Sequence, residues 1–387
     1  MRRFGLAIAG LAAALALTAC GGGGAGAPTS AAPTTGESSA PAGDTLVGVA
    51  MPTQTSERWI ADGNAVKEGL EAAGYKVDLQ YANDDIPTQT QQVDAMITAG
   101  AKVLIIAAID GTALTSQLQA AADAGIKVIA YDRLIRDSGN VDFYVTFDNY
   151  AVGVAQATAL LAGMGVTDRD GAKQGTPEKG QNIELFAGSL DDNNAHLFWK
   201  GAIDTLQPYF DDGTLVVKSG QTTIEQAATL RWLQETAQKR MEDLLTSTYG
   251  GTGEGLKGVL SPYDGLSRGI ITALQGVGMG PTVAKGLPIV TGQDAEIASV
   301  KLISDDVQNS TIFKDTRNLA TQAVTATQAF LSGGTPEAND TETYDNGVKV
   351  VPSYLLPVVT VYADNIQKEL IDTGYWTAEE VESGVAS

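Results

Sequence analysis

Three pairs of adjacent side chains combine hydrogen-bonding and stacking groups that suit a small polar ligand. Asp132-Arg133 closes a predicted strand, while Arg58-Trp59 and Arg231-Trp232 each place an indole beside a guanidinium. A carboxylate accepts hydrogen bonds, and a guanidinium donates several in a fixed fork. Vicinal hydroxyl groups match both because each hydroxyl donates and accepts, and an indole face stacks on the C–H face of a sugar ring.

Each of these pairs also has a purely structural interpretation. Asp132-Arg133 fits a surface ion pair at a loop, which contributes little to stability. Trp59 and Trp232 fit core anchors near helix starts. A further polar run, Asp191-Asp192-Asn193-Asn194, opens a predicted helix, where one such residue serves as an N-cap. Four in a row exceed what one cap needs, so some of them are expected to face a ligand.

The motifs of catalysis, nucleotide binding and metal binding fail on inspection. Gly265-Leu-Ser267-Arg-Gly269 has the spacing of a hydrolase nucleophile elbow, but the only histidine, His196, precedes the serine instead of following it. Gly276-Val-Gly-Met-Gly280 lacks the preceding strand of a dinucleotide loop. One histidine and one cysteine leave no transition-metal site. We therefore expect no catalytic residue, no cofactor and no metal, and we predict that the protein is not an enzyme.

The elements that must position these residues form an alternating pattern of strands and helices. Short β-branched runs are separated by stretches with apolar residues at helical spacing. This alternation predicts an α/β protein with doubly wound parallel sheets, and the number of strands favours two sheets over one. The predicted strands span residues 46–51, 76–81, 102–107, 127–131, 142–147, 182–187, 214–219, 257–261, 287–291 and 309–313.

Ligands of doubly wound sheets bind beyond the carboxyl ends of the strands. Nearly every predicted strand in this chain is followed there by an acidic residue, an amide or an arginine. These residues are expected to converge on one shared site from both sheets. They include Asp110, Asp132, Arg133, Asn149, Asp264 and Asp294.

The N-terminal residues predict export and lipid anchoring. Arg2 and Arg3 precede an apolar run over 4–17 that has the length of a signal-peptide core, and the run ends in Leu17-Thr18-Ala19-Cys20, which resembles a lipobox. We predict a signal peptide over 1–19, lipidation of Cys20, and a flexible Gly/Ala/Pro/Ser/Thr linker over 20–44. The formal net charge of −21 disfavours nucleic acid as a partner.

With these residues assembled, the chain resembles the monosaccharide-binding proteins of ABC importers, which have the type I periplasmic-binding-protein fold. The multiple-sugar-binding and xylose-binding branch is the nearest. The resemblance extends from Leu46 to about Gly374. It is carried by Ser56-Glu-Arg-Trp59, Tyr81-Ala-Asn-Asp-Asp-Ile86, Val128-Ile-Ala-Tyr-Asp-Arg-Leu-Ile135, Asp191-Asp-Asn-Asn194, Ser261-Pro-Tyr-Asp264, Gly292-Gln-Asp-Ala295 and Val351-Pro-Ser-Tyr-Leu-Leu356.

The resemblance implies two α/β lobes joined by three crossover strands, with the ligand in the cleft between them. The N-terminal lobe would comprise 45–149 and 295–338, and the C-terminal lobe 150–294 and 339–387. The ligand would be an aldopyranose such as xylose, galactose, glucose or arabinose, delivered to an ABC permease and its ATPase. A sugar receptor for a membrane sensor kinase or chemoreceptor is the alternative. A transcriptional regulator is disfavoured because a signal sequence occupies the place of its DNA-binding helices.

The resemblance also assigns roles to individual residues. Trp59 and Trp232 would sandwich the sugar ring. The side chains that would bind its hydroxyls and ring oxygen are Arg58, Asp132, Arg133, Asn193, Asp264, Asp294 and Lys314. Second choices are Asp110, Asn149, Asn194 and Thr236.

Overall fold

The structure of the protein is a computed structural model, and it describes residues 42–386. The predicted signal peptide, Cys20 and nearly all of the predicted linker lie outside these residues. Within 42–386, none of the helices has both the length and the apolar character that crossing a membrane requires.

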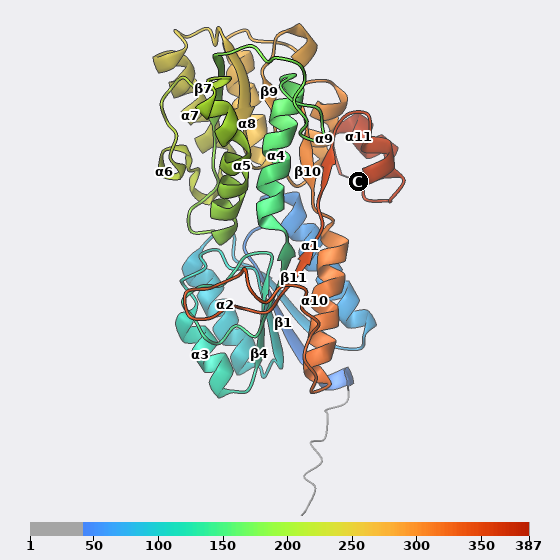
Figure 1. Cartoon of the computed structure of the whole chain (residues 1–387). Helices are drawn as coiled ribbons and strands as arrows, with labels where there is room; N and C mark the ends of the chain where they lie inside the picture. Colours follow the sequence, from blue (N-terminus) through green and yellow to red (C-terminus); the bar gives the residue numbers. More distant parts are fainter. Residues whose placement is uncertain (1–41, 387) are drawn as a thin grey trace, which may run out of the picture. The chain divides into compact units, whose positions relative to one another are not determined.

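The first lobe is built on a six-stranded parallel sheet in the order β11-β5-β4-β3-β1-β2 (Figure 1). All four residues of β3 are buried because helices cover both faces of the sheet. Val103 and Ile105 belong to the apolar cluster beneath α1 and α10, whereas Leu104 and Ile106 belong to the cluster beneath α2 and α3. The elements are β1 (Leu46–Met51), α1 (Glu57–Ala72), β2 (Lys76–Tyr81), α2 (Ile86–Thr98), β3 (Val103–Ile106), α3 (Thr115–Asp123), β4 (Lys127–Tyr131), β5 (Phe143–Phe147), α10 (Thr316–Leu331) and β11 (Ser353–Leu356).

The second lobe has a four-stranded parallel sheet in the order β7-β6-β8-β9. Helices α4 and α5 cover one face, and α7 and α8 cover the other. The short antiparallel pair β10–β12 lies against β9, because the amide of Ile312 donates to the carbonyl of Gly292. The elements are α4 (Asn149–Gly163), β6 (Gln181–Leu185), α5 (Asn193–Asp211), β7 (Leu215–Val217), α6 (Ile224–Ala227), α7 (Gln234–Thr248), β8 (Leu256–Leu260), α8 (Asp264–Gly276), β9 (Ile289–Val290), α9 (Ile297–Ser304), β10 (Thr311–Phe313), β12 (Val359–Val361) and α11 (Ala378–Ser383).

The chain passes between the two lobes three times, from β5 to α4, from β10 to α10, and from β11 to β12 (Figure 1). The predicted fold class, two doubly wound α/β lobes joined by three crossovers, is confirmed. The predicted ten strands are all present, with ends within two residues of the expectation. Strands β11 and β12 were not predicted as strands, since Pro352 and Pro357 interrupt the pattern around them.

The predicted lobe boundaries need correction after residue 294. Residues 295–313 were assigned to the first lobe, but Asn309 and Ile312 pair with Val290 and Gly292 in the second lobe. Conversely, β11 was assigned to the second lobe, yet it pairs with β5 in the first. The physical reason is that an apolar run reveals a strand without revealing which sheet edge it joins.

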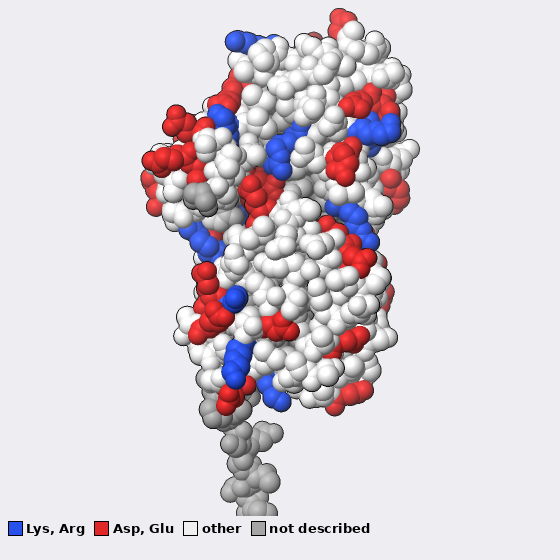
Figure 2. Space-filling model, turned by 180° about the vertical axis from the view of Figure 1, so that it is seen from behind, with Lys and Arg blue, Asp and Glu red and all other residues white. Residues whose placement is uncertain are grey.

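The surface carries its charges in a dispersed pattern. On the face shown in Figure 2, acidic and basic side chains alternate in small groups, and wide areas bear no charged side chain. Several of the basic side chains pair with acidic neighbours one helical turn away, as in Lys200–Asp204 and Lys239–Asp243. Exposed pairs of this kind contribute little to stability.

Candidate functional site

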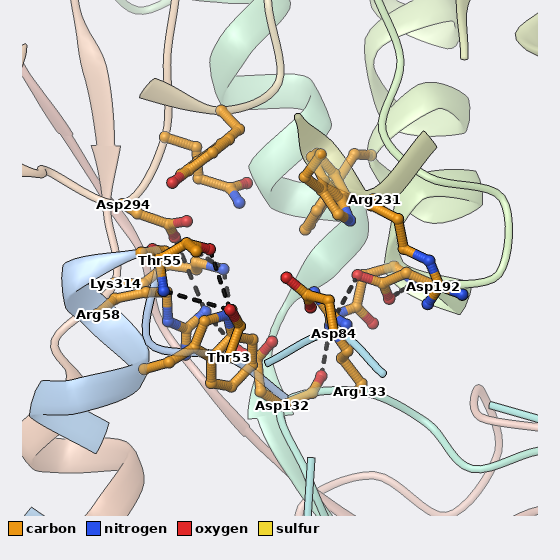
Figure 3. Close-up of a pocket in the computed structure, with 17 residues that line it drawn as sticks. Thr53, Thr55, Arg58, Asp84, Asp132, Arg133, Asp192, Arg231, Asp294 and Lys314 are labelled. Atoms are coloured by element: carbon orange, nitrogen blue, oxygen red, sulfur yellow. Dashed lines mark hydrogen bonds and ion pairs between the residues drawn. The ribbon is translucent and has the colours of Figure 1, made fainter. Parts of the chain in front are cut away.

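A cavity of about 540 Å³, including its opening to solvent, lies between the two lobes (Figure 3). Residues from both lobes and from one crossover line it. They are Thr53, Thr55, Ser56, Arg58, Trp59, Asp84, Asp132, Arg133, Asp192, Asn194, Phe198, Arg231, Trp232, Tyr263, Gln293, Asp294 and Lys314.

The carboxyl ends of parallel strands position most of this lining. In the first lobe, Thr53 follows β1, Asp84 follows β2, and Asp132 follows β4 directly. In the second lobe, Tyr263 follows β8 and Asp294 follows β9. Helix α1 presents Arg58 and Trp59 from its first turn, and α5 presents Asn194 and Phe198. Lys314 lies on the crossover between β10 and α10.

The inner end of the cavity is a network of four buried charges, Arg58, Asp132, Asp294 and Lys314. Arg58 Nη1 lies 2.9 Å from Asp132 Oδ2, and Lys314 Nζ lies 3.0 Å from Asp294 Oδ1. Longer contacts of 3.9 Å join Arg58 to Asp294 and Lys314 to Asp132. All four side chains are at most 7 % exposed. Buried charges at this depth require paired partners, and these groups supply one another with them.

The inner network keeps the carboxylate of Asp132 ionised. Burial by itself raises the pKa of Asp132, but Arg58, Lys314 and Arg133 together hold that pKa below its usual value. Burial also opposes the charge of Arg58, and Asp132 and Asp62 nevertheless raise the pKa of its guanidinium well above the usual value. The site therefore offers a fixed array of charged donors and acceptors to a neutral polar ligand near pH 7.

The outer end of the cavity carries a second group of charges. Arg133 Nε of the first lobe lies 3.2 Å from Asp192 Oδ2 of the second, and Arg231 Nη1 lies 3.4 Å from Asp191 Oδ2. Figure 3 shows Arg133, Asp192 and Arg231 on the side opposite Arg58 and Lys314. Burial raises the pKa of Asp84 and of Asp192, so these carboxylates are less firmly ionised than Asp132.

Two indoles contribute apolar surface, in different ways. Trp59 is 5 % exposed and belongs both to the first-lobe core and to the cavity wall, with the guanidinium of Arg58 4.3 Å from its ring centroid. Trp232 makes edge contacts with Phe198 and Tyr263 at centroid distances of 6.3 and 6.1 Å. The two interpretations of Trp59, core anchor and cavity residue, are thus compatible.

Local backbone geometry holds Trp232 in its place. Arg231 and Trp232 have φ angles of 58° and 55°, which non-glycine residues rarely adopt. Strain of this kind is typical of functional segments. The amide of Arg231 donates to Ser189 Oγ at 2.8 Å, and the indole ring lies directly over Gly188, where a Cβ would come within about 2.0 Å of it. Any larger residue at position 188 would therefore displace the indole of Trp232.

Of the nine ligand-binding residues predicted from the sequence, seven line the cavity and two do not. Asn193 is outside the lining, whereas its neighbour Asn194, a second choice, is inside it. Neighbouring residues on a helix point about 100° apart, so a shift of one position changes which side chain faces the ligand. Asp264 is fully buried behind the cavity and accepts from Gln308 Nε2 at 2.8 Å and from the amide of Glu296 at 3.0 Å. Burial raises the pKa of Asp264 well above its usual value.

The other second choices also lie away from the cavity. Asn149 is buried beneath it and donates to Asn194 Oδ1 at 3.0 Å. Asp110 caps a local turn at Thr112, and Thr236 is exposed on α7. The sequence analysis singled out the segments that contain Asp192 and Arg231 but gave these two lining residues no individual role. The other lining residues to which it gave no role are Thr53, Thr55, Ser56, Asp84, Phe198, Tyr263 and Gln293. Asp84 follows the carboxyl end of β2, so the expectation that ligands bind beyond strand ends would have selected it.

The rejected motifs occupy structural positions. Ser267 lies within α8, and its hydroxyl donates to the carbonyl of Thr291 at 2.6 Å. The other partners of its side chain within residues 42–386 are the hydroxyl of Ser261 and the carbonyl of Tyr263, and neither is a general base. His196 is exposed on α5 and contacts the carbonyl of Leu190. Over the same residues, no cluster of three or more potential metal ligands is present.

Two α/β lobes with a charged, indole-lined cavity between them define a two-lobed solute-binding protein. The chain belongs to the periplasmic binding protein domain family, whose model matches residues 47–335.

Similarity to individual proteins extends over nearly the whole described chain. The multiple sugar-binding periplasmic receptor ChvE of Rhizobium radiobacter is 57 % identical over 87 % of this chain and 92 % of its own length. The D-xylose-binding periplasmic protein of Escherichia coli is 35 % identical over 87 % of this chain and 92 % of its own. A solved solute-binding protein of an ABC transporter from Clostridium phytofermentans, with bound β-D-glucose, is 45 % identical with a TM-score of 0.81, and covers 87 % of this chain and all of its own.

Proposed function

We propose that this protein captures a monosaccharide between its lobes and delivers it to an ABC importer without altering it chemically. The ligand is an aldopyranose such as glucose, galactose, xylose or arabinose. The observation that carries this proposal is the cavity itself, in which two indoles and a network of ionised donors and acceptors come from both lobes.

The chemistry of the lining supports a neutral polyol over other ligands. The inner network contains two cations and two carboxylates, so it offers no net charge to an anion or a cation. Trp59 and Trp232 supply flat apolar surface of the kind that stacks on a pyranose. The relatives described above, named for binding multiple sugars or xylose or solved with glucose, agree with this ligand class.

Ligand binding is expected to favour the closed arrangement of the lobes. A ligand shifts a two-state equilibrium only if it binds one state more tightly, which here requires contact with both lobes. Asp132 of the first lobe and Trp232 of the second both line the cavity. Direct bonds between the lobes, such as Asn194 Nδ2 to the Asp132 carbonyl at 2.8 Å, assist closure.

Isothermal calorimetry with the four aldoses tests the ligand class. Saturable binding of at least one aldose is expected, and nuclear magnetic resonance of the recovered sugar should show it unchanged. Flat titrations with all four, together with binding of an amino acid or a peptide, would contradict the proposal. Uptake of labelled sugar by cells tests delivery to the importer. Cells that lack the protein should lose this uptake. Binding without any effect on uptake would favour a sensory receptor.

We further propose that the protein is exported by the signal peptide over 1–19 and anchored outside the cytoplasm by lipid on Cys20, with residues 20–44 as a tether. A lipid with two acyl chains anchors a protein stably to a membrane, whereas a single acyl chain gives only marginal binding. Replacing Cys20→Ser should therefore move the protein from the membrane fraction to the soluble fraction. Equal membrane association of mutant and wild type would exclude this anchor.

A further inference from the structure

Behind the inner network lies a buried carboxylate that does not line the cavity. Asp62 follows Arg58 by one turn of α1 and is fully buried. Its Oδ2 accepts from Arg58 Nε at 2.9 Å and from Nη2 at 2.7 Å, while its Oδ1 accepts from the hydroxyl of Tyr131. Asp62 is absent from the cavity lining. A carboxylate buried beside a ligand-facing arginine, with no ligand contact of its own, calls for an explanation.

The hydrogen bonds of Arg58 show what Asp62 does. A guanidinium has five N–H groups in a rigid plane. Two of them are used by Asp62 and one, on Nη1, by Asp132 at 2.9 Å. The remaining two N–H groups, one on each Nη, form no hydrogen bond within residues 42–386. Because the guanidinium is planar, fixing Nε and Nη2 also fixes the direction of Nη1.

We propose that Asp62 is a positioning residue for sugar binding: it holds the guanidinium of Arg58 so that Nη1 addresses Asp132 and the cavity. Asp62 does not touch the ligand. This role rests on the proposed function, since it gives Asp62 an effect on the affinity for the sugar.

The surroundings of Asp62 make this role dependent on pH. Burial raises the pKa of Asp62 to about 6, even though Arg58 lowers it. Burial also raises the pKa of Tyr131 well above its usual value, so Tyr131 remains a donor to Asp62. Protonation of Asp62 below about pH 6 removes one of the two close anionic partners of Arg58, the one that holds Nε and Nη2, while Asp132 still accepts from Nη1. The charged and titratable groups around Asp62, directly or through Arg58, are Arg58, Tyr81, Tyr131, Asp132, Asp294, Lys314 and Tyr375.

Titration of the wild-type protein and of Asp62→Asn with D-glucose and D-xylose, at pH 7.5 and at pH 5, tests the proposal. At pH 7.5 the variant should bind roughly tenfold more weakly, the scale of one charge-assisted hydrogen bond. The wild type should bind more weakly at pH 5 than at pH 7.5, whereas the affinity of the variant should change less. Asp84 and Asp192 also have raised pKa values, and the difference between the two profiles removes their contribution.

Tyr131→Phe provides a second variant in case Asp62→Asn folds poorly. The hydroxyl of Tyr131 stabilises the ionised form of Asp62, so its removal should raise the pH at which affinity falls. A merely structural role of Asp62 would not move that pH. The matched control is Asp204→Asn, because Lys200 and Asp204 form the same cation–carboxylate pair at the same helical spacing on the exposed surface of α5. Its affinity and pH profile should equal those of the wild type.

The outcomes separate this proposal from the proposed function. If the wild type binds neither these sugars nor another aldose, the proposed function fails. If the wild type binds but Asp62→Asn binds equally well, the positioning role is wrong. Parallel pH profiles for the wild type and Asp62→Asn, or an unchanged midpoint in Tyr131→Phe, would likewise overturn it.

Discussion

The two ends of the cavity are built from the same residue types but differ in depth. At the inner end, Arg58 and Lys314 are 5 % and 3 % exposed, and their carboxylate partners are similarly buried. At the outer end, Arg133 and Asp192 are 11 % and 5 % exposed, whereas Arg231 and its partner Asp191 are 26 % and 19 % exposed. Coulomb interactions strengthen as water is excluded, and a broken buried pair leaves an uncompensated charge. The inner end should therefore set affinity, and the partly exposed Arg231–Asp191 pair of the outer end should tolerate change.

Arg58→Ala should have the largest effect, because it removes the centre of the inner network. Truncating one partner of a buried, hydrogen-bonded charge pair costs about 2–5 kcal/mol, which is a loss of affinity between roughly thirtyfold and several thousandfold. The free energy of unfolding should also fall, by about 3–5 kcal/mol. Calorimetry and urea unfolding measure the two. Arg58→Lys keeps the positive charge without the planar guanidinium, so its affinity should lie between those of the wild type and Arg58→Ala. Near-normal affinity in Arg58→Ala would contradict the proposed difference between the two ends of the cavity.

The indoles should come next, and they should differ from each other. Trp232→Ala should weaken sugar binding by about 2 kcal/mol, roughly thirtyfold. Trp59→Ala should lose similar affinity and, because Trp59 is 5 % exposed in the first-lobe core, about 3–5 kcal/mol of stability as well. Trp199→Ala is the control, since Trp199 is partly buried against the second-lobe core and does not line the cavity. A stability loss with unchanged affinity at Trp232 would make it a core residue.

Arg231→Gln tests the outer end and should have a small effect. A half-exposed ion pair contributes about 0–1 kcal/mol, so affinity should fall no more than about fivefold. Any loss should shrink at high salt, because salt screens exposed charges. Calorimetry at low and at high salt measures this. A hundredfold, salt-independent loss would show that the outer end binds the ligand as firmly as the inner end.

Asp264→Asn should have the smallest effect on affinity, within about twofold. Asp264 lies behind the cavity and holds Gln308 and Glu296, so its loss should lower the free energy of unfolding by about 1–3 kcal/mol instead. Thermal unfolding of the unliganded protein and a sugar titration measure the two. A large loss of affinity at normal stability would return Asp264 to the ligand-binding residues.

The sequence predicted what local pattern encodes and missed what depends on the approach of distant segments. The strand of Val103–Ile106 and the Arg58-Trp59 pair follow from short-range composition and from strand ends. The pairing of β11 with β5 joins segments about two hundred residues apart, and no local sequence pattern predicts this pairing. Phe198 and Gln293 line the cavity only because the two lobes meet there. No sequence pattern marks Asp62 as relevant to the ligand, because it contacts Arg58 and not the cavity.

The placement of β11 has a consequence for how this chain can be divided. The first-lobe sheet ends in a strand made by residues 353–356, which covers β5 along its length. A shorter chain that stopped at residue 335 would leave Phe143–Phe147, an aromatic and β-branched strand, as an open sheet edge. Such edges recruit other chains and promote aggregation. The C-terminal segment is thus a protective cover for the first lobe, and the two lobes are not independently separable pieces of the polypeptide.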